Sequence, residues 1–428
     1  MSASRSQVGP RIAMPRVGPR KLAAAESTDV LNRLAYACVL FGVPLTTCNG
    51  LRITSSMTFG DPLLLMGGLL LGMAWLRHGG PRGAIPRWLV VAPAMLMAAG
   101  LLAILPSDDT ASLLPTIQFS VTLATMPLIL MFAGATSARI KRLGDAWLLA
   151  VVVNSTVAVL DLLKVTRIGA SLTFRDFVEG ADRSAGLTLH PNHLALVAAM
   201  ALPVAISMLA ANGTRRAAGL AALPFVLGGI AVSGSRGALL AGAGGVLLFF
   251  MLQARATRSW GGIFLTMAIV AAFAFLVFSP GASETFGVTG QRLATQGTAD
   301  PERLSLYRAA IDAGIRDPVV GQGFTVILVS HDIYLQLLEA GGVLALGGFL
   351  LFSGGIMTHA RELARVAPVD AAHLPTIAAA AGAGMGTWML FGLTANALYD
   401  RYLYIPAGLV LAIGFVCRGD PRSSPVSR

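Results

Sequence analysis

Long apolar segments alternate with short polar ones along most of the chain, and this pattern predicts membrane-spanning helices. A helix needs about 20 mainly apolar residues to cross the hydrocarbon core of a bilayer. Segments of this kind recur often enough to predict an all-α, polytopic bundle of about 12 spans. The predicted spans are residues 34–48, 58–76, 88–106, 113–135, 145–163, 193–211, 217–233, 237–253, 260–279, 333–357, 374–395 and 402–417.

Two polar connections, residues 164–192 and 280–332, are longer than the others. Connections of this length usually carry structure or function of their own. In the second, Asp300 suits an N-cap and Pro301 suits the first turn, which predicts a helix over Pro301–Ile315. Its apolar residues share one face, so it should lie along the membrane surface or cover the bundle. They are Leu304, Tyr307, Ile311 and Ile315.

Composition supports a membrane protein with one domain. Of the 428 residues, 55% are hydrophobic and 12% are charged, whereas soluble domains carry about 25% charged residues. We expect a single integral membrane domain at 34–417. Basic cytoplasmic tails at 1–33 and 418–428 would flank it, close to anionic lipid.

The net charge of +11 is unevenly distributed, and its distribution argues against nucleic acid as a partner. If the N-terminus is cytoplasmic and the chain changes side at each span, the inner segments hold 21 Lys and Arg against 6 Asp and Glu. The outer segments hold 11 Lys and Arg against 15 Asp and Glu. Because basic loops resist translocation, this predicts a multi-pass protein of the cytoplasmic (inner) membrane with both termini in the cytoplasm.

The sequence offers no pattern for a metal or a cofactor. Cys38, Cys48 and Cys417 lie in or beside predicted spans, and they form neither a disulfide framework nor a metal-ligand spacing. The Asp108-Asp109 pair could hold Mg²⁺, but no third acidic residue lies nearby in the sequence. We therefore expect neither a metal nor a cofactor.

Polar residues that could carry chemistry gather on the predicted outer side. The first cluster is Arg183, followed by His190, Asn192 and His193 at the start of a span. Pro191 and Asn192 are also typical of a helix start, and the histidines could simply bind headgroups or backbone.

The second cluster is a tight turn between two spans that contains Ser235 and Arg236. The small residues around Arg236 leave its guanidinium group accessible. Such a planar group can bind two oxygens of a diphosphate at once. The alternative is an arginine that only extends to the interface from an ordinary hairpin.

Two further clusters lie in and after the second long connection. Arg303 and Tyr307 are one turn apart and share a face of the predicted helix, although solvated surface groups would look the same. His331 and Asp332 open the tenth predicted span. A helix N-terminus disfavours imidazolium, so His331 would stay neutral and could take a proton from a hydroxyl group. The alternative for His331 is a simple capping role.

In this order, the clusters resemble the O-antigen ligase and polymerase superfamily of bacterial cell envelopes. The resemblance covers about residues 183–352 and implies a polytopic, glycosyltransferase C-like enzyme. Such an enzyme moves a glycan from a polyprenyl diphosphate, such as undecaprenyl diphosphate, to an acceptor on the outer or periplasmic face, without a required metal. The matching residues are Arg183 with Pro191-Asn192, the turn Ser235 to Ala238, Arg303 with Tyr307, Pro318 with Gly321 and Gly323, and His331 with Tyr334-Leu335.

The resemblance also implies roles for single residues. His331 would be the base or would orient the acceptor, while Arg236 and Arg303 would bind the diphosphate. Arg183 would be a weaker third diphosphate ligand. Asp332 departs from the family pattern, in which Asn often follows the histidine, and an acid there could raise the basicity of His331 or compete for its contacts. The residues expected to support the site or the acceptor are His190, Asn192, His193, Ser235, Tyr307 and Asp332.

Several alternatives stay open at this stage. The acceptor could be lipid A core, another lipid-linked glycan, or a protein or other envelope polymer. The rival class is a polytopic transporter or flippase of lipid-linked glycans. Transporters place charged residues near the middle of the bilayer at broken helices, whereas these clusters gather at one face. The sequence therefore favours a membrane glycosyltransferase of surface polysaccharide biosynthesis.

Overall fold

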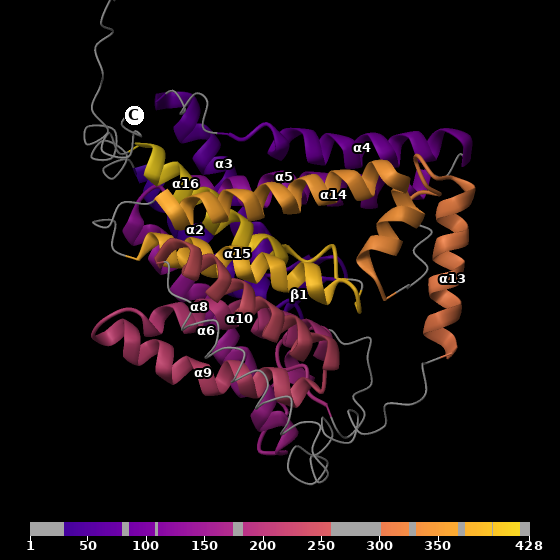
Figure 1. Cartoon of the computed structure of the whole chain (residues 1–428). Coiled ribbons are helices and arrows are strands. Elements are labelled where there is room, and N and C mark those ends of the chain that lie inside the picture. Colours follow the sequence, from indigo (N-terminus) through magenta and orange to yellow (C-terminus); the bar gives the residue numbers. More distant parts are fainter. Residues whose placement is uncertain are drawn as a thin grey trace, which may run out of the picture.

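The structure of the chain is a computed structural model, and it is almost entirely helical (Figure 1). Besides α-helices, the described part contains two short 3-10 helices and one small antiparallel hairpin, β1 (Arg52–Thr54) with β2 (Met57–Thr58). The prediction of an all-α bundle is confirmed. The described residues are 30–78, 85–107, 110–173, 183–257, 301–324, 331–366, 373–395 and 397–419.

Ten helical stretches in these ranges are long and apolar enough to cross a membrane, and each coincides with a predicted span. The α-helices are α2 (Val30–Thr47), α3 (Gly60–His78), α4 (Trp88–Ser107), α5 (Leu113–Ala133), α6 (Ser137–Leu162), α7 (Ile168–Leu172), α8 (Pro191–Leu209), α9 (Thr214–Ser233), α10 (Arg236–Thr257), α13 (Pro301–Arg316), α14 (Ile333–Val366), α15 (Leu374–Phe391) and α16 (Ile405–Gly419). The 3-10 helices are η1 (Thr110–Ser112) and η2 (Arg401–Tyr404).

Two of the twelve predicted spans need separate comment. Helix α3 occupies the place of the span at 58–76, with Asp61 in its first turn. It packs closely on α2, because a Cβ at Gly67 would lie 2.7 Å from the side chain of Val39. The predicted span 260–279 lies outside the described residues.

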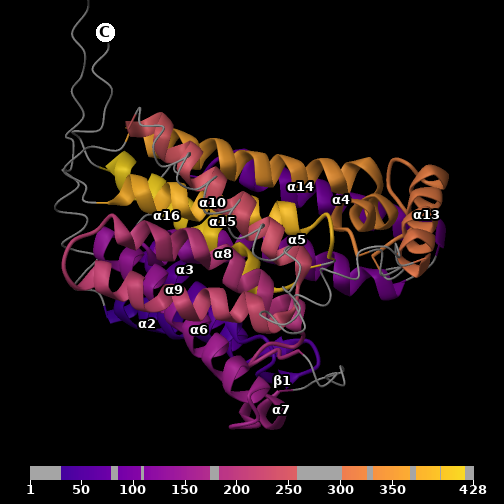
Figure 2. The ribbon, with the colours of Figure 1, turned by 60° about the horizontal axis from the view of Figure 1, so that its bottom comes forward.

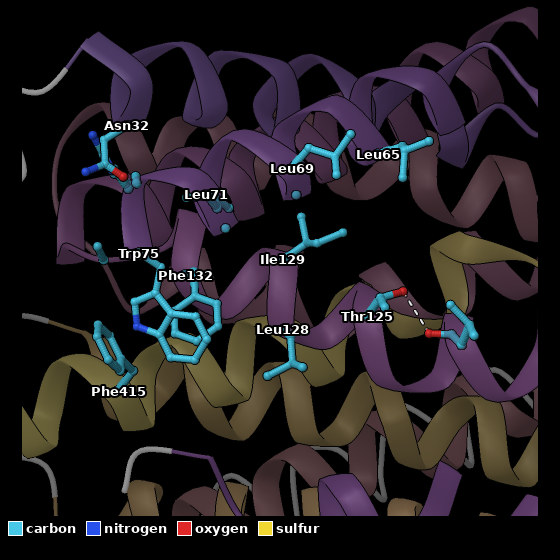
Figure 3. A pocket seen from close by; sticks show the side chains of 16 residues that line it. Asn32, Leu65, Leu69, Leu71, Trp75, Thr125, Leu128, Ile129, Phe132 and Phe415 are labelled. Carbon is cyan, nitrogen blue, oxygen red and sulfur yellow. Dashed lines mark hydrogen bonds between the residues drawn. The ribbon is translucent and has the colours of Figure 1, made fainter. Parts of the chain in front are cut away.

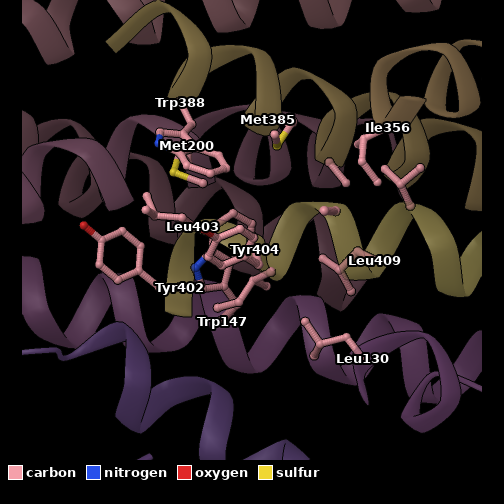
Figure 4. Close-up of a cluster of buried hydrophobic side chains, with 14 of the residues drawn as sticks. Leu130, Trp147, Met200, Ile356, Met385, Trp388, Tyr402, Leu403, Tyr404 and Leu409 are labelled. Atoms are coloured by element: carbon pink, nitrogen blue, oxygen red, sulfur yellow. The ribbon is translucent and has the colours of Figure 1, made fainter. Parts of the chain in front are cut away.

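Helices α8, α15 and α16 form the interior of the bundle, since they are the most buried of the spans. Small residues let their backbones approach, as is common between membrane helices. A Cβ at Gly384 of α15 would lie 2.8 Å from the carbonyl oxygen of Met200 on α8. Aromatic rings also pack in this interior, where Trp388 and Tyr404 lie edge to face with centroids 5.3 Å apart (Figure 4).

The starts of α2, α6 and α9 lie together with the ends of α3, α5 and α16, and we name this region the basic end. The guanidinium carbon of Arg139 lies 4.7 Å from the ring centroid of Tyr36, which joins α6 to α2. Arg215 donates to Asp145 across 2.9 Å, which joins α9 to α6. Arg139 and Arg215, two basic residues that the sequence places on the inner side, therefore lie at the same end of the bundle.

The opposite ends of these helices form the polar end. The N–H of Gly50, just after α2, donates to the carbonyl oxygen of Leu187, just before α8, across 2.9 Å. The side chain of Asn154 on α6 accepts from the N–H of Leu187 at 2.6 Å. In Figure 2, β1 and α13 lie at this end of the bundle and the end of α16 lies at the other.

Helix α14 is broken near its start, which the sequence pattern did not predict. Gly341 and Gly342 have non-helical backbone angles, and Gly342 has a φ of 59°. The connection after α13 hydrogen-bonds to the interrupted backbone: Val343 N–H donates to Pro318 and Gln322 N–H donates to Glu339. The break turns the first two turns of α14 away from the long part of the helix (Figure 1).

The predicted helix over Pro301–Ile315 is confirmed as α13. It crosses the end of the bundle and does not run parallel to the spans (Figure 1). It packs on α14 through small residues, since a Cβ at Gly314 would lie 2.8 Å from the side chain of Leu338. Leu304, Ile311 and Ile315 of the predicted apolar face are exposed. That face therefore points away from the bundle, as expected for a helix along a membrane surface.

Candidate functional site

The starts of α8, α10 and α14 meet the ends of α9 and α15 at the polar end. Ser184, ahead of α8, donates its N–H to the carbonyl oxygen of Val232 in α9 at 3.1 Å. Ile333 N–H, at the start of α14, donates to Gly392 at the end of α15 at 2.8 Å. Gly237 of α10 packs directly against Thr394. The first two predicted clusters thus meet at the end of α9, and the second and fourth meet at the end of α15.

Arg183 joins the first cluster to the second. Its Nε donates to the carbonyl oxygen of Ser233 at 2.5 Å, and its Nη2 donates to Oδ1 of Asn192 at 2.8 Å. Its side chain also lies against Gly234, which ends α9 with a φ of 63°. These two hydrogen bonds to neutral oxygens fix the plane of the guanidinium group.

Arg236 is the first residue of α10, and its side chain is exposed at the turn. Ser235, which precedes it, is buried. The Ser235 hydroxyl accepts from the N–H of Ala238 at 3.5 Å, so it serves the helix start. Arg236 therefore lies exposed at a helix N-terminus, which is a position that suits anions.

His190 caps α8, with Nδ1 accepting the N–H of Asn192 at 3.0 Å. Burial is the main cause that lowers the pKa of His190 to about 4, and the electrostatic influence of His193, Arg183 and His331 acts in the same direction. A neutral imidazole is the form that can accept this bond. The influence of His331 also places the fourth cluster within electrostatic range of the first.

His193 belongs to a network that the sequence did not suggest. Nδ2 of the buried Asn49 lies 2.8 Å from Nδ1 of His193 and 2.6 Å from Oδ1 of Asp400. Asp400 Oδ2 lies 3.4 Å from the same histidine nitrogen. Asn49 also accepts from the N–H of Leu189 at 3.1 Å. Both new residues flank predicted spans on the outer side, and that position was the one available signal.

Asp332, rather than His331, caps α14. Its Oδ1 accepts from the N–H groups of Tyr334 and Leu335 at 2.8 and 3.0 Å. His331 lies just before the cap, half-buried, in the left-handed region with a φ of 52°. Asp332 therefore has a structural role as the N-cap of α14.

The third cluster lies in α13. Tyr307 is half-buried, and the side chain of Arg303 lies outside the described part of the structure.

No group of three or more His, Cys, Asp and Glu side chains that could hold a metal ion occurs among the described residues.

A comparison with known families connects these clusters. Residues 221–350 match a family model described as O-antigen ligase. The matched part contains Arg236, α13 and His331, whereas Arg183 and the start of α8 precede it. No curated protein matches the chain. The family match confirms the resemblance to the O-antigen ligase and polymerase superfamily that the motifs indicated.

Proposed function

We propose that the protein is a glycosyltransferase that moves a glycan from a polyprenyl diphosphate to an acceptor at the polar end. The observation that carries this proposal is the position of Arg183, which is held by neutral oxygens at the turn that presents Arg236. Two guanidinium groups at one turn suit a diphosphate. The match to the O-antigen ligase family supports the same chemistry.

The proposed reaction is a single displacement. An acceptor hydroxyl oxygen forms a bond to the anomeric carbon, the bond from that carbon to the diphosphate oxygen breaks, and the hydroxyl proton passes to His331. Arg236, Arg303 and Arg183 would stabilise the negative charge that develops on the leaving diphosphate. Because a diphosphate is already a good leaving group, we propose that the reaction needs no metal.

The residues around this centre would hold it in place. His190 and Asp332 cap α8 and α14, while Asn192 orients Arg183. Through Asn49, Asp400 would orient His193 toward the acceptor. Tyr307 and Ser235 would support the donor side from α13 and from the turn.

We propose that the polar end faces the outside of the cytoplasmic membrane and that both termini are cytoplasmic. Charge supports this orientation, because the basic end carries the arginines of the short connections. A single cysteine in place of Ser55, in the exposed β1–β2 hairpin, should react with an impermeant reagent in intact cells. A cysteine in place of Arg361 should react only after the membrane is opened, and the reverse pattern would contradict the orientation.

Reconstitution tests the activity directly. The purified protein would be placed in liposomes with a polyprenyl-diphosphate glycan and three acceptors in turn: a lipid A core, a second lipid-linked glycan and an envelope protein. We expect glycan transfer to one of them, which mass spectrometry would detect together with released polyprenyl diphosphate. Movement of the intact donor across the bilayer without transfer to any acceptor would instead establish a flippase.

A further inference from the structure

A groove of about 420 Å³ lies between α3 and α5, away from the polar end (Figure 3). Its volume is within the range of small-molecule sites, roughly 300–1,000 Å³. Most of its wall is apolar, and none of the described residues that line it is acidic. The groove opens sideways, since Leu65 and Leu69 on its α3 wall are exposed. In a membrane, this opening would face lipid.

One end of the groove has a different character from the rest. Trp75, Phe132 and Phe415 form an aromatic cluster there, with ring centroids 5.4 Å apart for the first pair and 6.1 Å apart for the second (Figure 3). Asn32 and Arg139 line the groove as well, at the starts of α2 and α6. Aromatic and cationic side chains at the end of an apolar wall are typical of the boundary between acyl chains and headgroups.

Two glycines of α3 line the groove and add no side chain to its wall. A Cβ at Gly68 would lie 2.9 Å from Ile129 on α5, so this residue lets the helices approach. A Cβ at Gly72 would meet no atom within 4 Å. The space beside Gly72 is therefore not needed for packing within the described protein, and a ligand can occupy it.

We propose that this groove binds an acyl chain of an anionic phospholipid, with the lipid phosphate against Arg139. The apolar wall matches an acyl chain, and a single cationic side chain at one end matches a phosphate. The basic end concentrates further positive charge, including Lys141 and Arg142 on the same turn of α6. Basic pockets between membrane helices on the cytoplasmic side are suited to such headgroups. The site is separate from the proposed glycan-transfer centre.

Three variants test this site. Gly72→Leu fills the groove, Arg139→Gln removes the charge, and Gly354→Leu is the matched control. Gly354 is an exposed glycine of α14 where a Cβ also meets nothing within 4 Å. Each purified variant would be mixed with phosphatidylglycerol and phosphatidylcholine, and native mass spectrometry would count the retained lipids. Size-exclusion profiles would check folding.

The wild-type protein and Gly354→Leu should retain one phosphatidylglycerol in preference to phosphatidylcholine. Gly72→Leu should lose this lipid. Arg139→Gln should reduce the preference for phosphatidylglycerol over phosphatidylcholine about fivefold, which is the effect of one basic residue near the surface. A photoactivatable phosphatidylglycerol should crosslink to α3 and α5 of the wild-type protein. Equal retention of both lipids by the wild-type protein, or crosslinks confined to other helices, would overturn the proposal.

Discussion

The two ends of the bundle hold their arginines in different ways. At the polar end, Arg183 is bound by the carbonyl oxygen of Ser233 and the amide oxygen of Asn192. At the basic end, Arg215 is paired with the carboxylate of Asp145 at 2.9 Å. A hydrogen bond to a neutral acceptor fixes a guanidinium group in place, whereas a carboxylate also compensates its charge. The comparison separates arginines that suit a ligand site from those that only stabilise or orient the protein.

The largest expected difference between the ends is in activity. Arg236→Ala and His331→Ala should each reduce the initial rate of glycan transfer by about 10²–10³-fold, the usual cost of removing a group that stabilises a transition state. Arg215→Ala should leave the rate within about twofold, because Arg215 is paired with Asp145 at the basic end, away from the proposed centre. Rates would be measured in liposomes at equal protein levels. An Arg215→Ala variant as impaired as Arg236→Ala would break the comparison.

A subtler change at the polar end keeps the charge but loses its geometry. Arg183→Lys should raise the KM for the donor by about 10- to 100-fold, because lysine cannot replace both charged hydrogen bonds. Asn192→Ala should act in the same direction and by less, since it removes one of them. Donor titrations would measure the effect. A normal KM for Arg183→Lys would show that charge alone matters at this position.

The break in α14 should matter for stability as well as for the site. Gly342→Ala places a side chain at a φ of 59° and against the backbone of Val319. We expect a loss of about 1–3 kcal/mol, seen as a lower thermal midpoint in detergent. Gly354→Ala, in the regular part of the same helix, is the control and should not lower the midpoint. Equal midpoints for both variants would show that the break is not required.

The smallest predicted effect is a pH dependence at the start of α8. The pKa of His190 is lowered to about 4 in the folded protein, so the unfolded chain binds more protons between about pH 4 and 6.5. Stability should therefore fall as the pH drops through this window. His190→Asn keeps a good N-cap that does not titrate. Its thermal midpoint should fall less than that of the wild-type protein between pH 7 and 4.5. An equal fall of the midpoint in both proteins would show that His190 does not cause the loss of stability at low pH.

The sequence was sufficient for the helices of the described part of the chain. Apolar length predicted the spans, and the Pro301 signal predicted α13. These features depend on residues close together in the chain, for which length, periodicity and capping preferences are direct signals.

Features that depend on contacts between distant segments were not predictable in the same way. Asn49 and Asp400 are separated by more than 350 residues and meet only because the end of α2 and the start of η2 lie at the same place. The break at Gly341 and Gly342 depends on backbone bonds from the preceding connection. Glycine pairs are common in these spans, so the sequence could not single out this one.

Binding of the donor is the most direct test of the central claim, because it requires no knowledge of the acceptor. A polyprenyl-diphosphate glycan would be titrated into the purified wild-type protein, the Arg183→Ala/Arg236→Ala double variant and the Arg215→Ala variant, with native mass spectrometry as the readout. We predict that the double variant binds at least about tenfold more weakly, the loss expected for charged hydrogen bonds, while Arg215→Ala matches the wild-type protein. Unchanged binding by a folded double variant would contradict a diphosphate site at the polar end.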